Sequence, residues 1–201
     1  MASSVLAVAA MLAGCGSNHT AASAPSTTAP QATAGTSTAS GPGALQAEAN
    51  AAAAGDIPDN QVFLVFHNAR TGCSMKYPEG WAQQGSGRTV VFRDKNNIVR
   101  IDARGAPALT GASITQELRR LKGSRIVAPP QPIQLPAGRS YKVVYSTESA
   151  PNPVTGKRVL LVVDRYYLAH GGRRAVVDLG TPHGVDNVDA YRLMIESFRW
   201  S

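Results

Sequence analysis

Cysteine is scarce in this chain of 201 residues, which contains only Cys15 and Cys73. Two cysteines exclude the dense disulfide framework that holds many small secreted domains together. Long apolar runs are also missing, since the N-terminal run at residues 5–14 has ten residues and a membrane-spanning helix needs roughly 20. Lys and Arg are absent before Arg70. Any contact made by basic side chains therefore belongs to the rest of the chain.

Several motifs of enzymatic and metal chemistry are absent as well. Neither G-x-S-x-G nor S-x-x-K occurs, so the sequence lacks these two serine nucleophile motifs. The segment Asp94–Asn97 begins like a calcium loop but lacks the following Gly and the distal Glu. The histidines are not spaced closely with Cys, His or carboxylates as zinc ligands are, and they are His19, His67, His170 and His183. We therefore predict no catalytic residue, no metal site and no cofactor.

The apolar N-terminal run fits the core of a secretory signal peptide, here residues 1–14. Leu12-Ala13-Gly14-Cys15 resembles the lipobox of bacterial lipoproteins. The resemblance implies that Leu12 is a recognition residue, that cleavage falls between Gly14 and Cys15, and that Cys15 carries a diacylglyceryl group and palmitate. Because two or more acyl chains anchor a protein stably, we expect a lipoprotein held on the outside of the cell membrane.

The mature chain divides into a tether and a domain. Residues 15–56 consist mostly of Ala, Ser, Thr, Gly and Pro, and such a segment cannot bury enough apolar surface to offset the entropy lost on ordering. From Ile57 onward Val, Ile, Phe, Tyr and Arg appear together. Residues 57–201 are long enough for one hydrophobic core. In this domain we expect Cys73 to be a buried structural thiol.

Alternating apolar and polar residues predict several strands in the domain, at 62–67, 73–78, 87–94, 97–105, 140–148, 157–170 and 173–182. Residues 94–97 and 170–174 have the composition of tight turns. In 97–105 we expect Ile98, Val99 and Ile101 to face the core. The Pro-rich segment 128–138 is predicted to be an extended crossing.

Two amphipathic helices are expected. Residues 113–123 have apolar residues at helical spacing, with Ser113 as N-cap and Gly123 as the stop. Residues 185–200 begin with Asp186 and Asp189, which suit a cap and a first turn. The expected apolar face of this second helix is Val188, Tyr191, Leu193, Met194 and Ile195. Hairpins and two helices together predict an α+β domain with a curved, mainly antiparallel sheet.

Two short stretches resemble PsbP-like domains. One is Met75-Lys76-Tyr77-Pro78-Glu79-Gly80-Trp81, followed by Val91-Phe92, and the other is Tyr191 with Met194-Ile195-Glu196-Ser197-Phe198. The resemblance covers roughly residues 62–200 and implies an α-β-α sandwich. Family members in plants and cyanobacteria are extrinsic subunits of the oxygen-evolving photosystem, and other bacterial members look like lipoproteins without an assigned role. Nothing in this sequence supports the photosynthetic role.

Charge is the main functional signal. After residue 56 the chain has 20 basic and 11 acidic residues, a net charge of +9. The basic residues cluster at Arg119, Arg120, Lys122 and Arg125, and at Arg173 and Arg174. Outside the membrane such a domain meets anionic lipids, envelope proteins or cell-wall polymers. The secretion signal argues against nucleic acid as the partner.

These observations favour a non-enzymatic interaction module that is anchored in the cell envelope. The basic helix face and the Pro-rich crossing are its candidate contact surfaces. The alternative is a binding protein for a small anionic ligand or a metal ion, with a pocket between sheet and helix. An enzyme has no residue evidence in its favour.

Overall fold

The computed structural model describes residues 46, 50, 54–105, 109–152 and 154–201. Contacts divide the chain into residues 1–38 and 39–201, and all described residues belong to the second unit. The predicted signal peptide, Cys15 and nearly all of the tether lie outside the described residues. Among the residues that are described, no helix is both long and apolar enough to cross a membrane.

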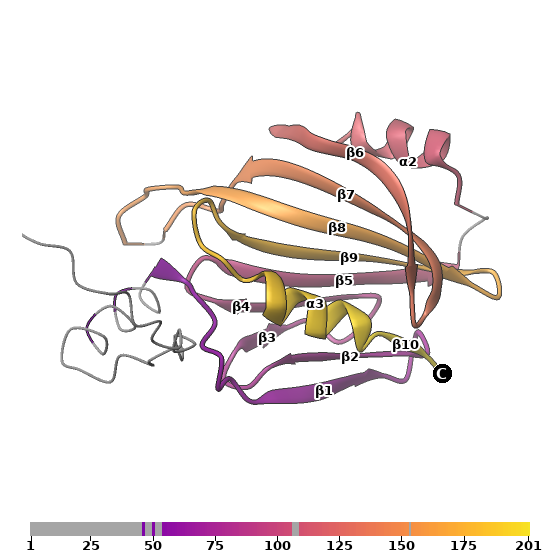
Figure 1. The fold of residues 1–201 in the computed structure, drawn as a ribbon, viewed down its shortest axis with the longest axis horizontal. Coiled ribbons are helices and arrows are strands. Elements are labelled where there is room, and N and C mark those ends of the chain that lie inside the picture. Colours follow the sequence, from indigo (N-terminus) through magenta and orange to yellow (C-terminus); the bar gives the residue numbers. More distant parts are fainter. Residues whose placement is uncertain (1–45, 47–49, 51–53, 106–108, 153) are drawn as a thin grey trace, which may run out of the picture. The chain divides into compact units, whose positions relative to one another are not determined.

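Antiparallel strands dominate the described part of the chain (Figure 1). A seven-stranded sheet has the order β3-β4-β5-β9-β8-β7-β6 and a three-stranded sheet has the order β1-β2-β10. The strands of the larger sheet are β3 (Ala82–Gln84), β4 (Thr89–Asp94), β5 (Asn97–Gly105), β6 (Ser124–Leu135), β7 (Gly138–Glu148), β8 (Leu160–His170) and β9 (Arg173–Pro182). Those of the smaller sheet are β1 (Phe63–Asn68), β2 (Cys73–Pro78) and β10 (Arg199–Trp200).

The predicted tight turns are confirmed. Asp94 pairs with Asn97 across a two-residue turn in which Lys95 has a φ of +50°. His170 pairs with Arg173 across Gly171 and Gly172, which have φ values of +55° and +73°. Such left-handed turns match the twist of the strands that they join.

The Pro-rich segment 128–138 was predicted to be an extended crossing. Residues 128–135 are instead part of the edge strand β6. It pairs only with β7, and the register shifts between Ile126 and Ala128 and again between Ala128 and Gln131. Proline cannot donate a hydrogen bond to a neighbouring strand, so an edge strand with irregular pairing accommodates it.

Helix α2 (Gly111–Leu118) begins earlier and ends earlier than expected. Its N-cap is Thr110, whose Oγ1 accepts a hydrogen bond from the Ser113 backbone, while Ser113 Oγ accepts one from the Thr110 backbone. Ser113 is thus the reciprocal partner in the cap and not the cap itself. Gly123, with a φ of +71°, lies in the turn before β6.

Helix α3 (Val188–Glu196) buries only part of its predicted apolar face. Tyr191, Met194 and Ile195 are buried, whereas Val188 and Leu193 are 69% and 39% exposed. The chain leaves the helix after Glu196 and enters β10, which pairs with β2. The expectation of a helix up to residue 200 was therefore wrong at its C-terminal end.

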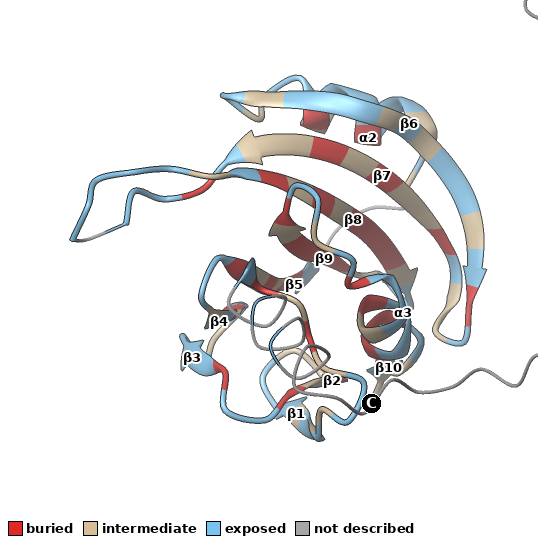
Figure 2. Ribbon diagram, turned by 60° about the vertical axis from the view of Figure 1, so that its left-hand side comes forward, coloured by how far each residue is buried: buried red, intermediate tan, exposed pale blue. Residues whose placement is uncertain are grey.

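Much of β8 and β9 is buried (Figure 2), and neighbouring residues of β8 face different cores. Tyr166 and Leu168 of β8 pack in the core that contains α3 and β2. Tyr167, between them, packs with α2. The two helices therefore cover opposite faces. Val99 and Ile101 join the α3 core as predicted, but Ile98 packs beside Tyr145 on the face with α2.

The sheet-rich α+β class is confirmed, because in the described part of the chain helices α2 and α3 accompany mainly antiparallel strands. The expectation of a single curved sheet is wrong, since β1, β2 and β10 form a sheet of their own. This small sheet shares a core with α3, as Cys73 and Met75 of β2 pack together with residues of that helix.

Candidate functional site

A basic segment connects α2 to β6. Arg119 is the C-cap of α2, Arg120 and Lys122 follow in the turn, and Arg125 lies near the start of β6. All four side chains are exposed. None forms an ion pair or a side-chain hydrogen bond with any residue that the structure describes. We call Arg119, Arg120, Lys122 and Arg125 the basic segment.

Arg173 and Arg174, which were also predicted to belong to the contact surface, have partners inside the domain. Arg173 Nη1 donates hydrogen bonds to the main-chain oxygens of Gly72 (3.2 Å) and Ser201 (2.8 Å), and its guanidinium lies over the Trp200 ring. Arg174 forms an ion pair with Glu117 of α2, with Nη2 3.1 Å from Oε2. Adjacent residues of a strand point to opposite faces, so these two arginines do not form one surface.

Two exposed apolar residues follow the basic segment along β6. Ile126 is 41% exposed and Val127 is 60% exposed. They lie where the pairing of β6 with β7 shifts in register. Basic side chains beside apolar ones are a combination that suits the boundary between lipid head groups and acyl chains.

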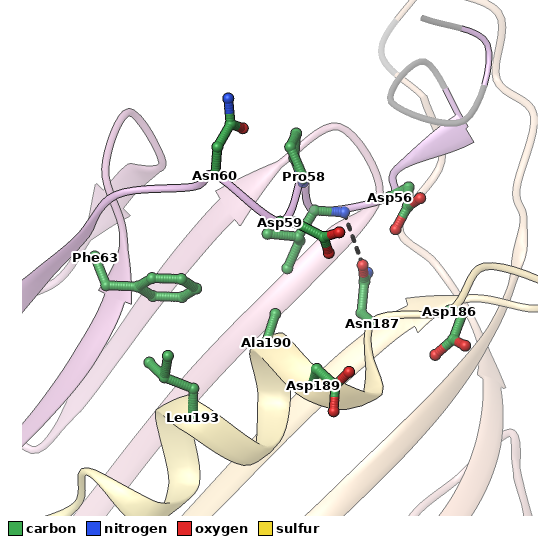
Figure 3. A pocket seen from close by; sticks show the side chains of 11 residues that line it. Asp56, Pro58, Asp59, Asn60, Phe63, Asp186, Asn187, Asp189, Ala190 and Leu193 are labelled. Atoms are coloured by element: carbon green, nitrogen blue, oxygen red, sulfur yellow. Dashed lines mark hydrogen bonds between the residues drawn. The ribbon is translucent and has the colours of Figure 1, made fainter. Parts of the chain in front are cut away.

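A pocket of about 700 Å³ lies between the segment that precedes β1 and the start of α3 (Figure 3). Phe63, Ala190 and Leu193 supply apolar surface. Four carboxylates also line it, those of Asp56, Asp59, Asp186 and Asp189. For Asp186 and Asp189 the sequence predicted only a cap and a first-turn role, although the spacing Asp-x-x-Asp occurs at both 56–59 and 186–189.

Asn187 holds the two sides of this pocket together. Its Oδ1 accepts a hydrogen bond from the Ile57 backbone at 2.8 Å (Figure 3). Its Nδ2 donates to Thr181 Oγ1 at 2.8 Å and to the Gly55 carbonyl at 3.1 Å. Asn97 Nδ2 reaches the same Gly55 carbonyl at 2.6 Å. Buried amides with this many partners fix the backbone around them.

The acidic pocket does not suit the predicted alternative of a small anionic ligand, because its carboxylates would repel an anion. The other part of that alternative was a metal ion. Within the described ranges, no group of three or more His, Cys, Asp or Glu side chains is arranged to hold a metal.

Cys73 is buried at the start of β2, as the sequence predicted. Burial raises the pKa of its thiol, while Thr71 at 3.3 Å and the charge of Arg173 act in the opposite direction. A thiol with a raised pKa is a poor nucleophile at neutral pH. This residue therefore serves packing.

No family model matches the chain, and no curated protein matches it. Solved structures that match include a protein from Bacteroides thetaiotaomicron, at 17% identity and a TM-score of 0.44 over 68% of this chain and 48% of that one. This chain thus spans about half the length of the Bacteroides protein. The Ran-binding protein Mog1p from Saccharomyces cerevisiae matches at 10% identity and a TM-score of 0.45, over 69% of this chain and 95% of its own.

The cyanobacterial PsbP from Synechocystis also matches, at 14% identity and a TM-score of 0.49, over 73% of this chain and 98% of its own. A PsbP structure is thus among the matches. Membership of the PsbP-like family stays a prediction from the sequence.

Proposed function

We propose that this chain is a lipid-anchored protein of the bacterial cell envelope whose PsbP-like domain, residues 57–201, is a non-enzymatic interaction module. In this account residues 1–14 are removed, Cys15 carries the lipid, and residues 15–56 form the tether. The module binds an anionic component of the envelope through the basic segment. Arg173 and Arg174 are no longer included in this surface, because both have partners inside the domain.

The single observation that supports this function most is the unpaired state of the basic segment. Arg119, Arg120, Lys122 and Arg125 are exposed and have no acidic partner in the described chain. Exposed like charges within a few residues of one another repel, so an anionic partner lowers their energy. The exposed side chains of Ile126 and Val127 favour lipid head groups over a soluble polymer as that partner.

Photo-crosslinking in intact cells tests the proposal with the full-length, lipidated protein. A photoreactive residue replaces Gln116, which is exposed on α2 one turn before Arg120. One variant reverses the basic segment (Arg119→Glu, Arg120→Glu, Lys122→Glu). Its matched control reverses Lys76→Glu, Arg93→Glu and Arg139→Glu, which are also two Arg and one Lys, exposed and without a side-chain partner in the described residues.

We expect mass spectrometry to identify an anionic lipid or another anionic envelope component that the wild type and the control capture. The basic-segment variant should lose this product. Capture of the same products by both variants would show that the basic segment is not the contact surface.

A further inference from the structure

A cavity of about 210 Å³ lies apart from the basic segment, near the turn between β1 and β2. Arginine side chains line it from separate elements: Arg70 from that turn, Arg88 from just before β4, Arg104 from β5 and Arg173 from β9. Thr71 and Trp200 complete most of the lining. This cluster is not apparent in the sequence, because its four arginines are spread over more than 100 residues of the chain.

Two of the four arginines of the cavity have no acidic partner among the described residues. Arg104 is held by Asp102, with Nε 3.2 Å from Oδ1, and Arg173 is held by the main-chain oxygens of Gly72 and of Ser201, the last residue of the chain. Arg70 and Arg88 are exposed, and neither side chain has an ion-pair or hydrogen-bond partner among the described residues. None of the described residues that line the cavity is Asp or Glu.

The backbone around the cavity is fixed before any ligand arrives. Asn68 is buried, and its Oδ1 accepts hydrogen bonds from the backbone of Arg70 and Thr71. Its Nδ2 donates to the Gly87 carbonyl at 2.8 Å, which ties the Arg70 turn to the residue before Arg88. The Arg88 carbonyl in turn accepts a hydrogen bond from the Ala103 backbone at 2.9 Å. A site with a preset backbone loses less entropy when it binds.

Gly72 is required where the turn meets Arg173. It has a φ of +61°, and a Cβ at this position would come within 2.4 Å of Arg173 Nη1. Glycine thus lets the guanidinium of Arg173 approach the turn closely enough to bond to the Gly72 carbonyl.

We infer that this cavity is a binding site for a small phosphate-type oxyanion, either free or as a phosphomonoester head group. Guanidinium groups match such oxygens with paired hydrogen bonds and keep their charge at every physiological pH. Arg70 and Arg88 supply the unpaired donors, while Arg173 and Arg104 are held in place by their own partners and form the wall of the cavity. The site shares no residue with the basic segment. A negative result at one of the two surfaces therefore leaves the other proposal unaffected.

The two tryptophans of the chain make the test specific. Trp200 lines the cavity, whereas Trp81 does not and is buried elsewhere. Inorganic phosphate is titrated into the ¹⁵N-labelled 201-residue protein at constant ionic strength, and the two indole N–H signals are followed by NMR. The same titration is done with Arg70→Gln/Arg88→Gln and with a control, Arg93→Gln/Arg139→Gln, which removes two exposed arginines outside the cavity.

We expect a saturable shift of the Trp200 signal in the wild type and the control, with little change at Trp81. The Arg70→Gln/Arg88→Gln variant should bind phosphate at least tenfold more weakly. A shift that does not saturate, or that is equal in all three proteins, would overturn the inference. A parallel titration with soluble dihexanoyl phosphatidic acid separates the sources, since a free-anion site excludes it and a head-group site binds it.

Discussion

Arg165 and Asp178 form a buried, bidentate ion pair between β8 and β9, with Nε 2.6 Å from Oδ1 and Nη2 2.9 Å from Oδ2. The two side chains are only 3% and 6% exposed. The rings of Tyr145 and Tyr167 lie 5.2 and 5.9 Å from the guanidinium carbon. Burial alone would lower the pKa of Arg165, but the hydrogen bonds to Asp178 and its charge raise it overall. The arginine therefore stays charged inside the domain.

Removing one partner of this pair should destabilise the domain strongly. Asp178→Asn leaves the charge of Arg165 buried without compensation, and we expect a loss of about 3–5 kcal/mol in unfolding free energy. Urea unfolding measures this loss. The double variant Arg165→Met/Asp178→Leu should recover much of it, because no uncompensated charge remains. A loss below about 1 kcal/mol in Asp178→Asn would contradict this account.

Replacing Asn187 should lower the unfolding free energy more than replacing an exposed asparagine. Asn187→Ala leaves the Ile57 backbone N–H without its partner and removes one of the two hydrogen bonds to the Gly55 carbonyl, and an unsatisfied buried group costs about 1–3 kcal/mol. The matched control is Asn60→Ala, which alters an exposed residue lining the same pocket. Thermal or urea unfolding should show a clear loss for Asn187→Ala alone. Equal stability of the two variants would show that this network does not hold the start of the domain.

Stability should fall at alkaline pH. Burial, together with the charge of Asp178, raises the pKa of Tyr145 to about 12. Burial also raises the pKa values of Tyr166, Tyr167 and Tyr191. In the unfolded chain tyrosine ionises near pH 10, so the unfolded state loses protons that the folded state keeps. The stabilisation is complete below pH 10 and is lost as the pH rises toward 12.

Unfolding free energies measured between pH 9 and 12, with phenolate absorbance followed in parallel, check this dependence. Tyr191 donates a hydrogen bond to the Gly180 carbonyl at 2.7 Å, so Tyr191→Phe should be less stable at neutral pH and lose less on going to high pH. A stability that stays constant up to pH 12 would be incompatible with buried tyrosines of raised pKa.

Cys15 should decide where the protein resides in the cell. With a lipid on Cys15, the protein fractionates with membranes, and Cys15→Ser should release it or leave it uncleaved. Membrane fractionation and the mass of the N-terminal peptide test this directly. A wild-type N-terminal peptide without a diacylglyceryl mass would exclude the anchor.

Local patterns in the sequence predicted the strands and their hairpins well. The turns at Lys95 and at Gly171–Gly172 depend on residues next to one another, so their chemistry is visible in the chain. The end of the last helix was not predictable in this way. Trp200 pairs with Cys73 in β10, and a pairing over that sequence distance leaves no local signal.

The candidate sites were predictable only in part. Composition pointed to basic residues, and the four residues of the basic segment are indeed exposed. The other two basic residues of the predicted surface have partners on different faces of the sheet: Arg173 contacts Ser201, and Arg174 contacts Glu117. Such partners depend on which strands lie side by side. The arginine cavity could not be predicted for the same reason, since only the folded domain brings Arg70 and Arg173 to the lining of one cavity.

The measurement that tests the central claim most directly is the affinity of the full-length protein, without its lipid, for vesicles of neutral and of anionic composition. Each basic residue near an anionic surface contributes about 1 kcal/mol. Reversing Arg119, Arg120 and Lys122 should therefore weaken binding to anionic vesicles by at least about a hundredfold. The control with Lys76, Arg93 and Arg139 reversed should retain most of its affinity. Equal affinities of the two variants would contradict a docking role for the basic segment.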